Sequence, residues 1–396
     1  MEVKEQFDKR FKFIVANSSI SRFGLSAFNI IIIWVVLFET KNAFLAGLGD
    51  GLLSLPLFFS FLIGALIDRT TKKRQIALLV SFLRAVFLVS ILYGIMEHSI
   101  FLTLASIYAS GFTLGLTSDV VNSIRASWTK EVLKESQYKS GSALSSVVTY
   151  VAEGAGYLLS GVILLLGFTL SFEIIIFVFL IAVIPLLFVK TSYVPEEIGA
   201  LESLKNGLNF IKKQRAVSEL MIIALILNVT FGMMGIIFIS LVQLRFHLPS
   251  YFASIVFSIF IFGIIIGSSV APRVKGSLGP ISMASFFIIG LLLASVSFLN
   301  SIFLDFIPSL IIGLIIGLLN VLYNASMLRI VSNEYMARIS GAFNTFSVAA
   351  TFSSGMIGGA IIQLTSILDS FIVIGALVIA SVAIWPFFKS LYNTSL

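Results

Sequence analysis

Residues 64–74 read Gly-Ala-Leu-Ile-Asp-Arg-Thr-Thr-Lys-Lys-Arg, a stretch that places five charged side chains after one long apolar run and before another. The preceding run covers 44–67 and the following run covers 75–96, so each is longer than 20 residues. A helix of about 20 apolar residues crosses roughly 30 Å of hydrocarbon. The stretch therefore predicts two membrane-spanning helices that are joined by a short charged loop.

The same alternation of apolar runs and polar connections continues through all 396 residues. A mean hydropathy of +1.07, with 58% hydrophobic and only 11% charged residues, excludes an ordinary soluble domain. We therefore predict an all-α polytopic membrane protein with twelve transmembrane helices. The predicted spans are 13–38, 44–67, 75–96, 100–122, 138–166, 168–189, 217–241, 251–271, 279–299, 302–326, 339–364 and 369–388.

The connections between spans differ strongly in charge, and this difference predicts the orientation of the chain. Of the 26 Lys and Arg residues, Lys41 and Arg245 lie on one side of the predicted membrane and Arg22 and Arg84 lie inside spans, which leaves 22 on the other side. Cytoplasmic loops carry the excess of Lys and Arg in membrane proteins, so both termini are predicted to be cytoplasmic. The net charge of +7 is spread over these short loops, which favours contact with lipid head groups over nucleic-acid binding.

The longest connection divides the predicted spans into two groups of six. We predict an amino-terminal six-helix bundle over 1–189, a cytoplasmic linker with a surface helix over 190–216, and a carboxyl-terminal six-helix bundle over 217–396. The halves are weakly repeated, because residue types coincide at positions 199 apart: Ala126 with Ala325, Ser127 with Ser326, Glu135 with Glu334, and Gly156 with Gly355. Two pseudo-symmetric six-span halves are typical of a duplicated transporter fold.

The sequence lacks the residue sets that most enzymes and metal sites require. It contains no Cys, and its two His, His98 and His247, lie beside predicted outer loops without the spacing of metal ligands. It has no G-x-x-x-x-G-K-[ST] phosphate-binding loop, and no Ser/His/Asp set stands out. We expect no enzyme activity, catalytic residue, metal or cofactor. The short outer loops favour a multi-pass protein of a bacterial or archaeal cell membrane, without a cleaved signal peptide.

Polar side chains recur at helical spacing within the predicted spans. A polar group is costly in hydrocarbon, so such a line of residues is expected to face a cavity or another helix. Close helix packing through small residues explains any single Gly or Ser equally well. The Asn residues fit that explanation less well, and we predict a substrate cavity between the halves that is lined by Ser26, Asn29, Thr149, Asn228, Asn320, Asn324 and Asn344.

Glu153 lies about 15 residues into its predicted span, near the membrane midplane. A charged side chain at that depth costs about 2.5–3.5 kcal/mol on insertion scales. Arg22 and Arg84 are the candidate partners, because they are the basic residues inside spans. A carboxylate held between burial and a cation can bind a proton in one conformation and release it in another. We predict that Glu153, Arg22 and Arg84 serve proton coupling or charge recognition; a permanent ion pair and a residue of a water-filled cavity are the alternatives.

The charged stretch resembles the G-x-L-x-D-R-x-G-R-K loop signature of the major facilitator superfamily. Thr71 stands where a second Gly is expected, and six positions match by residue or by charge: Gly64, Leu66, Asp68, Arg69, Lys72 and Lys73. The resemblance covers essentially the whole chain, and it implies two bundles that rock around a central site. We expect Gly64, Asp68, Arg69, Lys72 and Lys73, with Asp119 nearby, to form a weak conformational latch. Anchoring by positive charge alone is the alternative.

Within the superfamily, three segments look like the drug and siderophore exporter branch, which includes enterobactin-exporter-like members and drug:proton antiporters. These segments are 83–85, 203–213 and 338–344. The segment 153–157, Glu-Gly-Ala-Gly-Tyr, departs from the exporter signature because its Pro is absent. The Arg that many proton-coupled members carry in their fourth span is also missing from 100–122.

The resemblance implies a secondary active transporter, and proton-coupled export of an amphipathic organic compound or drug by alternating access is the expected function. Uptake or facilitated diffusion of a small metabolite is the alternative, and a non-transporting membrane receptor is a third. The expected partners are a small-molecule substrate, protons and membrane lipids, without nucleic acid. The expected oligomeric state is a monomer.

Overall fold

The computed structural model describes residues 7–59, 63, 67, 70–189, 215–330 and 333–392, without the side chains of some of these, mainly within 333–345. Helices are the regular elements of this part of the chain. Contacts divide the chain into unit 1, which comprises Met1–Ile32 and Leu55–Ala200, and unit 2, which comprises Ile33–Ser54 and Leu201–Leu396. The division falls inside the first helix.

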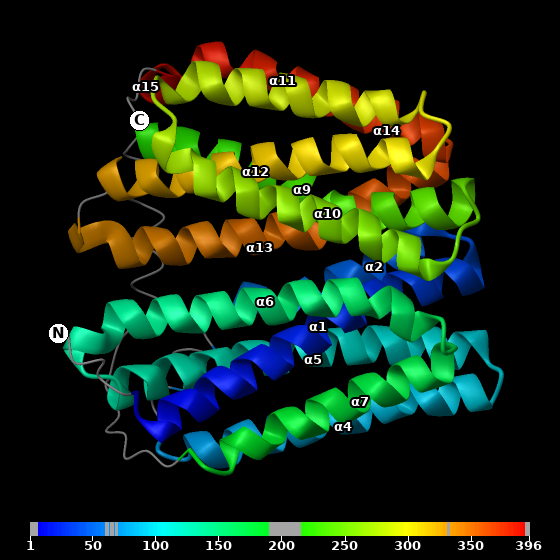
Figure 1. Cartoon of the computed structure of the whole chain (residues 1–396), viewed down its shortest axis with the longest axis vertical. Helices are drawn as coiled ribbons and strands as arrows, with labels where there is room; N and C mark the ends of the chain where they lie inside the picture. Colours follow the sequence, from blue (N-terminus) through cyan, green and yellow to red (C-terminus); the bar gives the residue numbers. More distant parts are fainter. Residues whose placement is uncertain are drawn as a thin grey trace. The chain divides into compact units, whose positions relative to one another are not determined.

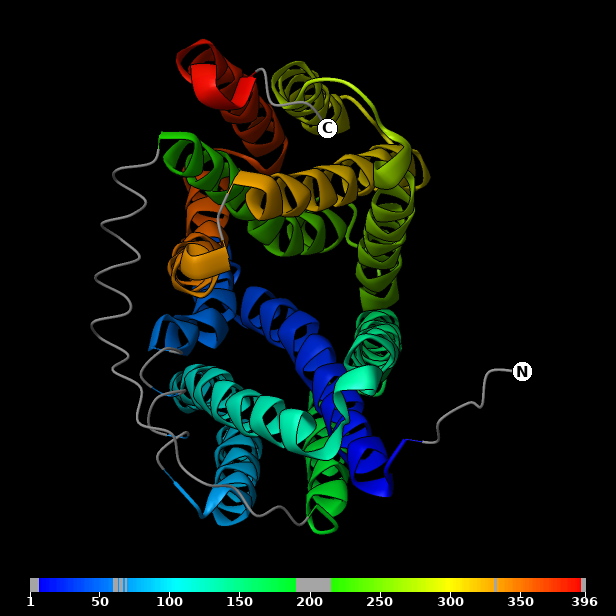
Figure 2. The same ribbon diagram turned by 90° about the vertical axis from the view of Figure 1, so that its left-hand side faces the viewer.

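Unit 1 is built around the first part of helix α1 (Lys9–Thr40). Figures 1 and 2 show α1 passing between α5 and α6, and side chains of α1 bond to residues of α5, α6 and α7. A buried cluster that includes Phe11, Trp128 and Leu186 packs α1, α5 and α7 together. The other elements of unit 1 are η1 (Leu55–Phe59), α4 (Lys73–Met96), α5 (Ile100–Val132), η2 (Glu135–Gln137), α6 (Tyr138–Leu164) and α7 (Phe168–Leu186).

Unit 2 contains the last part of α1 and four pairs of extensively packed helices, α10 with α12, α2 with α13, α9 with α13, and α11 with α14. These helices are α2 (Ala43–Ser54), α9 (Arg215–Ser240), α10 (Ser250–Val270), α11 (Leu278–Val296), α12 (Ile302–Ile330), α13 (Asn333–Leu364) and α14 (Ile367–Ser381). The short elements are a π-helical turn, η3 (Leu241–Arg245), with η4 (Ala271–Arg273), η5 (Val382–Phe387) and α15 (Lys389–Tyr392).

Eleven helices of the described residues are long and apolar enough to cross a membrane. The all-helical class and the multiple predicted spans are thereby confirmed. The second predicted span, 44–67, corresponds to a shorter apolar segment, Ala43–Phe59, and most of its remainder lies outside the described residues. The count of twelve, the orientation of the termini and the domain boundaries at 189 and 216 stay predictions, and the linker 190–214 lies outside the described residues.

Helix ends follow local polar chemistry. Ser99 precedes α5, and its hydroxyl accepts a hydrogen bond from the N–H of Leu102 at 3.3 Å. Ser366 precedes α14, accepts from the N–H of Asp369 at 3.1 Å and donates to the Asp369 carboxylate at 2.7 Å. Both contacts satisfy N–H groups that a helix start leaves without intrahelical partners. Gly167 separates α6 from α7 with a φ of 94°, a backbone angle that favours glycine.

Glycines allow the closest helix contacts of unit 2. A Cβ atom on Gly263 or Gly267 of α10 would collide with the backbone of Leu310 or Leu314 in α12. Gly313 and Gly317 of α12 approach the backbone of α10 in the same way. These two glycines belong to a line of small and polar residues in the predicted tenth span, so helix packing explains this part of the line.

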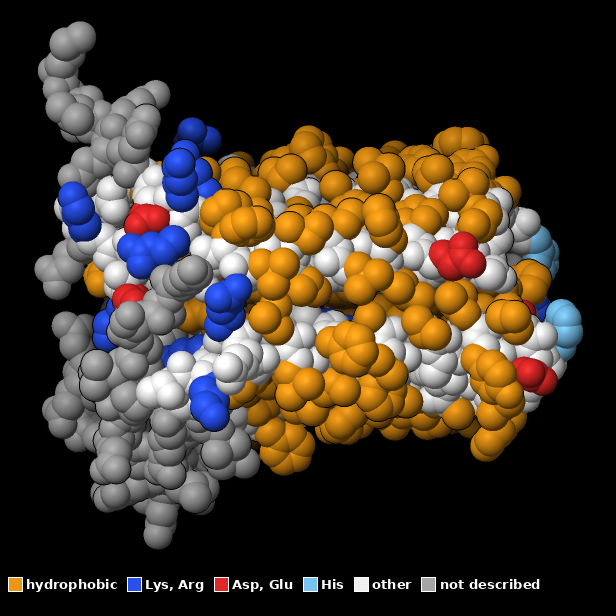
Figure 3. All heavy atoms as spheres, turned by 90° about the horizontal axis from the view of Figure 1, so that it is seen from below, with side chains coloured by type: hydrophobic (Ala, Val, Ile, Leu, Met, Phe, Trp, Pro, Cys, Tyr) orange, Lys and Arg blue, Asp and Glu red, His pale blue; other side chains and the backbone are white. Residues whose placement is uncertain are grey.

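Large apolar side chains cover the outward faces of α4 and α7 in unit 1. Figure 3 shows apolar side chains across the middle of one face of the molecule, with Lys and Arg gathered toward one end. Exposed apolar surface of this extent suits contact with lipid rather than with water. The exposed side chains of these two helices include Leu79, Phe82, Val86, Val89, Phe177, Leu180 and Ile184.

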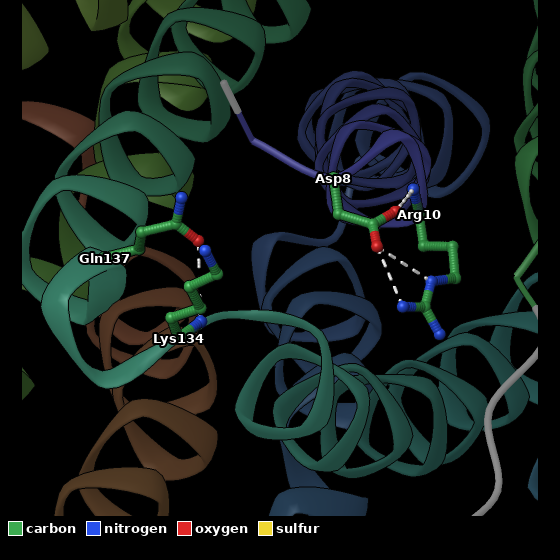
Figure 4. Close-up of polar contacts among 4 residues, drawn as sticks. All are labelled: Asp8, Arg10, Lys134 and Gln137. Atoms are coloured by element: carbon green, nitrogen blue, oxygen red, sulfur yellow. Dashed lines mark hydrogen bonds and ion pairs between the residues drawn. The ribbon is translucent and has the colours of Figure 1, made fainter. Parts of the chain in front are cut away.

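Asp8 caps the start of α1, as Figure 4 shows. Its carboxylate accepts a hydrogen bond from the Arg10 N–H at 2.7 Å and lies 2.8 Å from Arg10 Nη2. The side-chain hydrogen bond from Arg10 lowers the pKa of Asp8 below its ordinary value of 3.8. Figure 4 also shows the turn before α6, where the Lys134 N–H donates to Gln137 Oε1 at 3.4 Å.

We predict that Gly267→Ala lowers the thermal stability of the purified protein, because the new methyl group meets backbone that cannot rotate away. Overpacking of this kind costs about 1–3 kcal/mol. Gly154→Ala is the matched control, since nothing lies within 4 Å of a Cβ at that position of α6. The control should retain or raise the apparent melting temperature in detergent, because Ala favours helix over Gly by up to about 1 kcal/mol. Equal melting temperatures for the two variants would contradict the packing of α10 against α12.

We predict that Asp8→Ala increases hydrogen exchange of the first-turn amides of α1 near pH 7, because an N-cap contributes about 1 kcal/mol. The pKa of Asp8 is lowered in the folded state, so its contribution is present above the ordinary value of 3.8 and is lost as the pH falls below it. The difference between Asp8→Ala and the parent protein should therefore shrink as the pH falls below 3.8 and through the lowered pKa of Asp8. Asp8→Asn, which retains the cap, should show a smaller difference, since a half-exposed ion pair adds little.

Candidate functional site

Four helices of unit 1 line an open cavity of about 300 Å³. The helices are α1, α4, α5 and α6, and hydroxyl and charged side chains make up most of the lining. A cavity of this volume is large enough for a small molecule. The lining residues are Ser18, Ser21, Arg22 and Leu25 of α1, Arg84 of α4, Ser118, Asn122 and Arg125 of α5, and Ser145, Ser146, Thr149, Tyr150 and Glu153 of α6.

Helical spacing places these residues on one face of each helix. Ser146, Thr149 and Glu153 follow one another at steps of three and four along α6, and Ser118, Asn122 and Arg125 do the same along α5. Residues three and four apart lie on the same side of an α-helix. The polar residues therefore face the cavity. Tyr150 of α6 also lines the cavity, and much of its side chain is exposed.

Arg22 and Glu153 form an ion pair across α1 and α6. Arg22 Nη2 lies 3.0 Å from Glu153 Oε1, with side-chain exposures of 46% and 18%. The contact depends on a close approach of the two helices, because a Cβ on Gly156 would meet the carbonyl oxygen of Phe23 at 2.5 Å. Ser18 and Thr149 lie 3.3 Å apart, oxygen to oxygen, and connect the same two helices. Of the two cations considered from the sequence, Arg22 is the one that reaches Glu153.

Arg84 lines the same cavity but bonds to neutral groups. Its side chain is 3% exposed, and it donates to Thr117 Oγ1 at 2.7 Å and to Ser118 Oγ at 3.1 Å. The guanidinium carbon lies 5.6 Å from the centre of the Phe179 ring. Hydroxyl oxygens and an aromatic face solvate a guanidinium without neutralising its charge. The role of Arg84 in tuning Glu153 stays a prediction.

Arg125 is a cavity residue that the sequence analysis assigned to a cytoplasmic connection. The apolar run ends near Asn122, but α5 continues to Val132 and carries Arg125 to the cavity. Arg125 Nη1 donates to Asn17 Oδ1 at 3.2 Å, and Arg125 Nη2 donates to Asn122 Oδ1. Asn17 is itself held by a 2.6 Å hydrogen bond to the Ala182 carbonyl oxygen. The helical spacing of Ser118, Asn122 and Arg125 was the signal in the sequence that could have indicated this position.

The predicted latch is only partly within the described residues. Gly64, Asp68 and Arg69 lie outside them. Lys72 is exposed at the start of α4, whereas Lys73 is 2% exposed and donates from Nζ to Ser127 Oγ at 2.6 Å. Asp119 is buried on α5 and is not among the residues that line the cavity. The latch stays a prediction.

The remaining predicted substrate residues have varied surroundings. Ser26 is buried and donates to the Arg22 carbonyl oxygen at 2.8 Å, and Asn29 is half-buried on α1. In unit 2, Asn228 donates to the Ala224 carbonyl oxygen at 2.8 Å and lies 3.5 Å from Ser347 Oγ. Thr149 lines the cavity. The prediction that the other residues of this set contact the same substrate stays a prediction. Asn320 and Asn324 are exposed on α12, and the Asn344 side chain lies outside the described residues.

Within the described residues, no group of three or more His, Asp or Glu side chains could hold a metal ion. His98 and His247 are both exposed in turns, where each adopts a positive φ. Asp305, which the sequence places at an outer span end, is only 1% exposed at the start of α12. Its burial differs from the exposure typical of a residue at the membrane interface.

Comparisons with known proteins agree with this architecture. The chain is similar in structure to a variant of the nucleoside transporter NupG, with a TM-score of 0.77 and 13% identity over 97% of this chain and 100% of that chain. It is similar to the POT family transporter PepTSo, with a TM-score of 0.74 and 14% identity over 98% and 99% of the two chains. An autoinhibited POT family peptide transporter matches with a TM-score of 0.74 and 12% identity over 98% of each chain.

Identities this low show the fold alone. No curated protein matches the sequence. The family profile described as Major Facilitator Superfamily matches residues 14–355, which is most of the chain. The chain therefore belongs to the major facilitator superfamily.

Proposed function

We propose that the protein is a proton-coupled secondary active transporter that moves a small molecule by alternating access. The cavity of unit 1 lies on the substrate path in this proposal, and Glu153 binds the coupling proton. One observation carries it: an acidic side chain within an apolar helix faces a cavity and forms a 3.0 Å ion pair with Arg22. Membership of a transporter superfamily supports the transport itself.

A proton on Glu153 would remove half of the ion pair. Arg22 would then lose its counter-charge and become available to other groups in the cavity. A membrane potential contributes about 2.3 kcal/mol per charge for each 100 mV, which is enough for an accumulation of about 50-fold. A permanent ion pair between Arg22 and Glu153 would hold α1 against α6 but would not couple proton movement to substrate movement. The proposal therefore requires that Glu153 changes its protonation during the transport cycle.

Two substrate classes follow from different observations. The resemblance of 83–85, 203–213 and 338–344 to exporters supports proton-driven efflux of an amphipathic organic compound. The lining of the cavity favours a second candidate, uptake or facilitated diffusion of a small polar metabolite, because five Ser and one Thr contribute hydroxyl groups. Hydroxyl groups discriminate polar substrates by hydrogen bonds that an apolar compound cannot form.

We predict that Glu153→Gln abolishes substrate-driven proton movement and leaves the protein folded. The measurement uses inverted membrane vesicles with an imposed pH gradient, to which a panel of small polar metabolites and amphipathic dyes is added while a pH-sensitive fluorophore is recorded. Glu173→Gln is the matched control, because Glu173 is exposed on α7 and lies outside the cavity. The control should retain the response of the parent protein.

A proton response that persists in Glu153→Gln would assign the coupling to another residue. Counterflow of the active compound in inverted and right-side-out vesicles then separates efflux from uptake. A parent protein that binds a compound but never exchanges it across the bilayer would refute transport.

A further inference from the structure

The cavity of unit 1 carries an excess of positive charge. Its charged lining residues are Arg22, Arg84, Arg125 and Glu153, so three cations face one anion. Glu153 pairs with Arg22. In the part of the chain that the structure describes, neither Arg84 nor Arg125 forms an ion pair. Two guanidinium groups therefore lack a carboxylate partner among the described residues.

The protein partners of both groups leave most of their donors available. A guanidinium has five N–H groups, and Arg84 directs two of them to Thr117 and Ser118, which leaves three. Arg125 directs two to Asn17 and Asn122, which also leaves three. The four partners are neutral oxygens that fix the orientation of each guanidinium. Planar donors fixed in this way match the paired oxygens of a carboxylate, sulfonate or phosphate group.

Like charges in the cavity repel one another. Arg125 lies close enough to both Arg84 and Arg22 for this repulsion to be felt. Asp119 follows Ser118 by one residue, is buried and is not among the residues that line the cavity. A buried cation without a partner is costly in a low-dielectric interior. A bound anion would supply the missing charge and accept the unused N–H donors.

We infer that the cavity binds a small, hydroxylated organic anion between Arg84 and Arg125, and that protonation of Glu153 strengthens this binding. The hydroxyl groups of Ser18, Ser145 and Ser146 would accept or donate hydrogen bonds to the uncharged part of the ligand. The inference rests on the proposed transport function, for which it names the substrate class.

The charges in the cavity decide whether protonation of Glu153 strengthens or weakens anion binding. Protonated Glu153 no longer neutralises Arg22. The net charge that the cavity presents to the anion therefore rises from two positive charges to three. By linkage, a bound anion must favour protonation by the same factor. A proton and an anion that strengthen each other's binding cross the membrane together. This sign favours uptake with protons over the exchange that an exporter requires.

Several charged or titratable groups face Glu153 from the helices that line the cavity. Arg22, Arg84 and Arg125 come from the three other helices, and Tyr150 comes from α6 itself. Tyr157 lies one turn further along α6, close to Arg22. Among the described residues that line the cavity, Glu153 is the one carboxylate.

The test measures ligand-induced thermal stabilisation of the full-length protein in detergent. The probes are isethionate, gluconate and inorganic phosphate, each compared with an uncharged or cationic analogue: ethanolamine for isethionate and sorbitol for gluconate. Isethionate keeps its charge at ordinary pH, so its binding is not affected by protonation of the probe. We expect at least one of the anions to stabilise the parent protein and the analogues to have no effect.

The variants assign the effect to residues. Arg84→Gln with Arg125→Gln should weaken anion binding by roughly tenfold or more, because charge-assisted hydrogen bonds are lost. Glu153→Gln, which imitates the protonated side chain, should bind the anion more tightly than the parent at the same pH, whereas Glu173→Gln should bind it as the parent does. If the double Gln variant fails to fold, the charge-preserving Arg84→Lys with Arg125→Lys should keep the preference for anions with lower affinity.

Three results would overturn the anion site: stabilisation by the analogues but by none of the anions, no stabilisation by any probe, or anion binding that is unchanged in the double variants. The transport proposal fails separately. An anion that binds and is never exchanged across vesicles refutes transport and leaves the site, whereas Glu153-dependent proton movement with a neutral or cationic compound refutes the site and leaves transport.

Discussion

A charged side chain inside hydrocarbon requires a partner, and unit 1 supplies an acidic partner for one of its three cavity arginines. Insertion of an unpaired cation at the middle of a membrane helix costs about 2.5–3.5 kcal/mol. Arg22 meets this constraint through Glu153 at 3.0 Å. Arg84 and Arg125 meet it with hydroxyl and amide oxygens, which retain the full positive charge. Arg84 and Arg125 keep a charge that no acidic partner neutralises, so they must face polar surroundings. This requirement explains why hydroxyl and charged side chains make up most of the cavity lining.

The ion pair in turn depends on small residues at the helix contacts. Gly156 lets α6 approach the backbone of α1 at Phe23, one residue after Arg22. A side chain at that position would separate the helices and lengthen the distance between Arg22 and Glu153. The same device recurs in unit 2, where Gly263 and Gly313 bring the backbones of α10 and α12 together. Without water to drive association between lipid-facing helices, close van der Waals contact supplies much of the attraction.

The sequence was sufficient to predict what hydrophobicity and helical spacing control. Apolar runs located the long helices, and the spacing of Ser146, Thr149 and Glu153 identified a polar face of α6 that lines the cavity. Arg125 was missed because hydropathy marks where a helix leaves the apolar run, whereas α5 continues for ten residues beyond Asn122, to Val132. Loop charge alone cannot distinguish a basic residue in a connection from one on an extended helix.

Other features depend on local breaks and on contacts that hydropathy alone does not reveal. Ala43–Phe59 is interrupted after Ser54, where α2 gives way to the 3₁₀ turn η1 and Pro56 lacks a backbone N–H donor. Asn320 and Asn324 have the polarity of cavity residues and are exposed on α12, so their place in a substrate cavity stays a prediction. Polarity predicts that a residue avoids lipid, but packing against other helices decides which surface it faces.

The strength of the proposed coupling can be bounded from electrostatics. A unit charge about 6 Å from another, at an effective dielectric constant of about 20, interacts by about 3 kcal/mol. Ionised Glu153 would weaken the binding of a nearby anion by an amount of this order, which is a factor of about 100. That value lies at the upper end of ordinary coupling free energies between sites. A smaller coupling would let protons and anions cross separately, and a much larger one would hold the anion after it reached the far side. In the proposed cycle, protonation of Glu153 frees Arg22 to attract the anion, and the anion is released when the ion pair with Arg22 forms again.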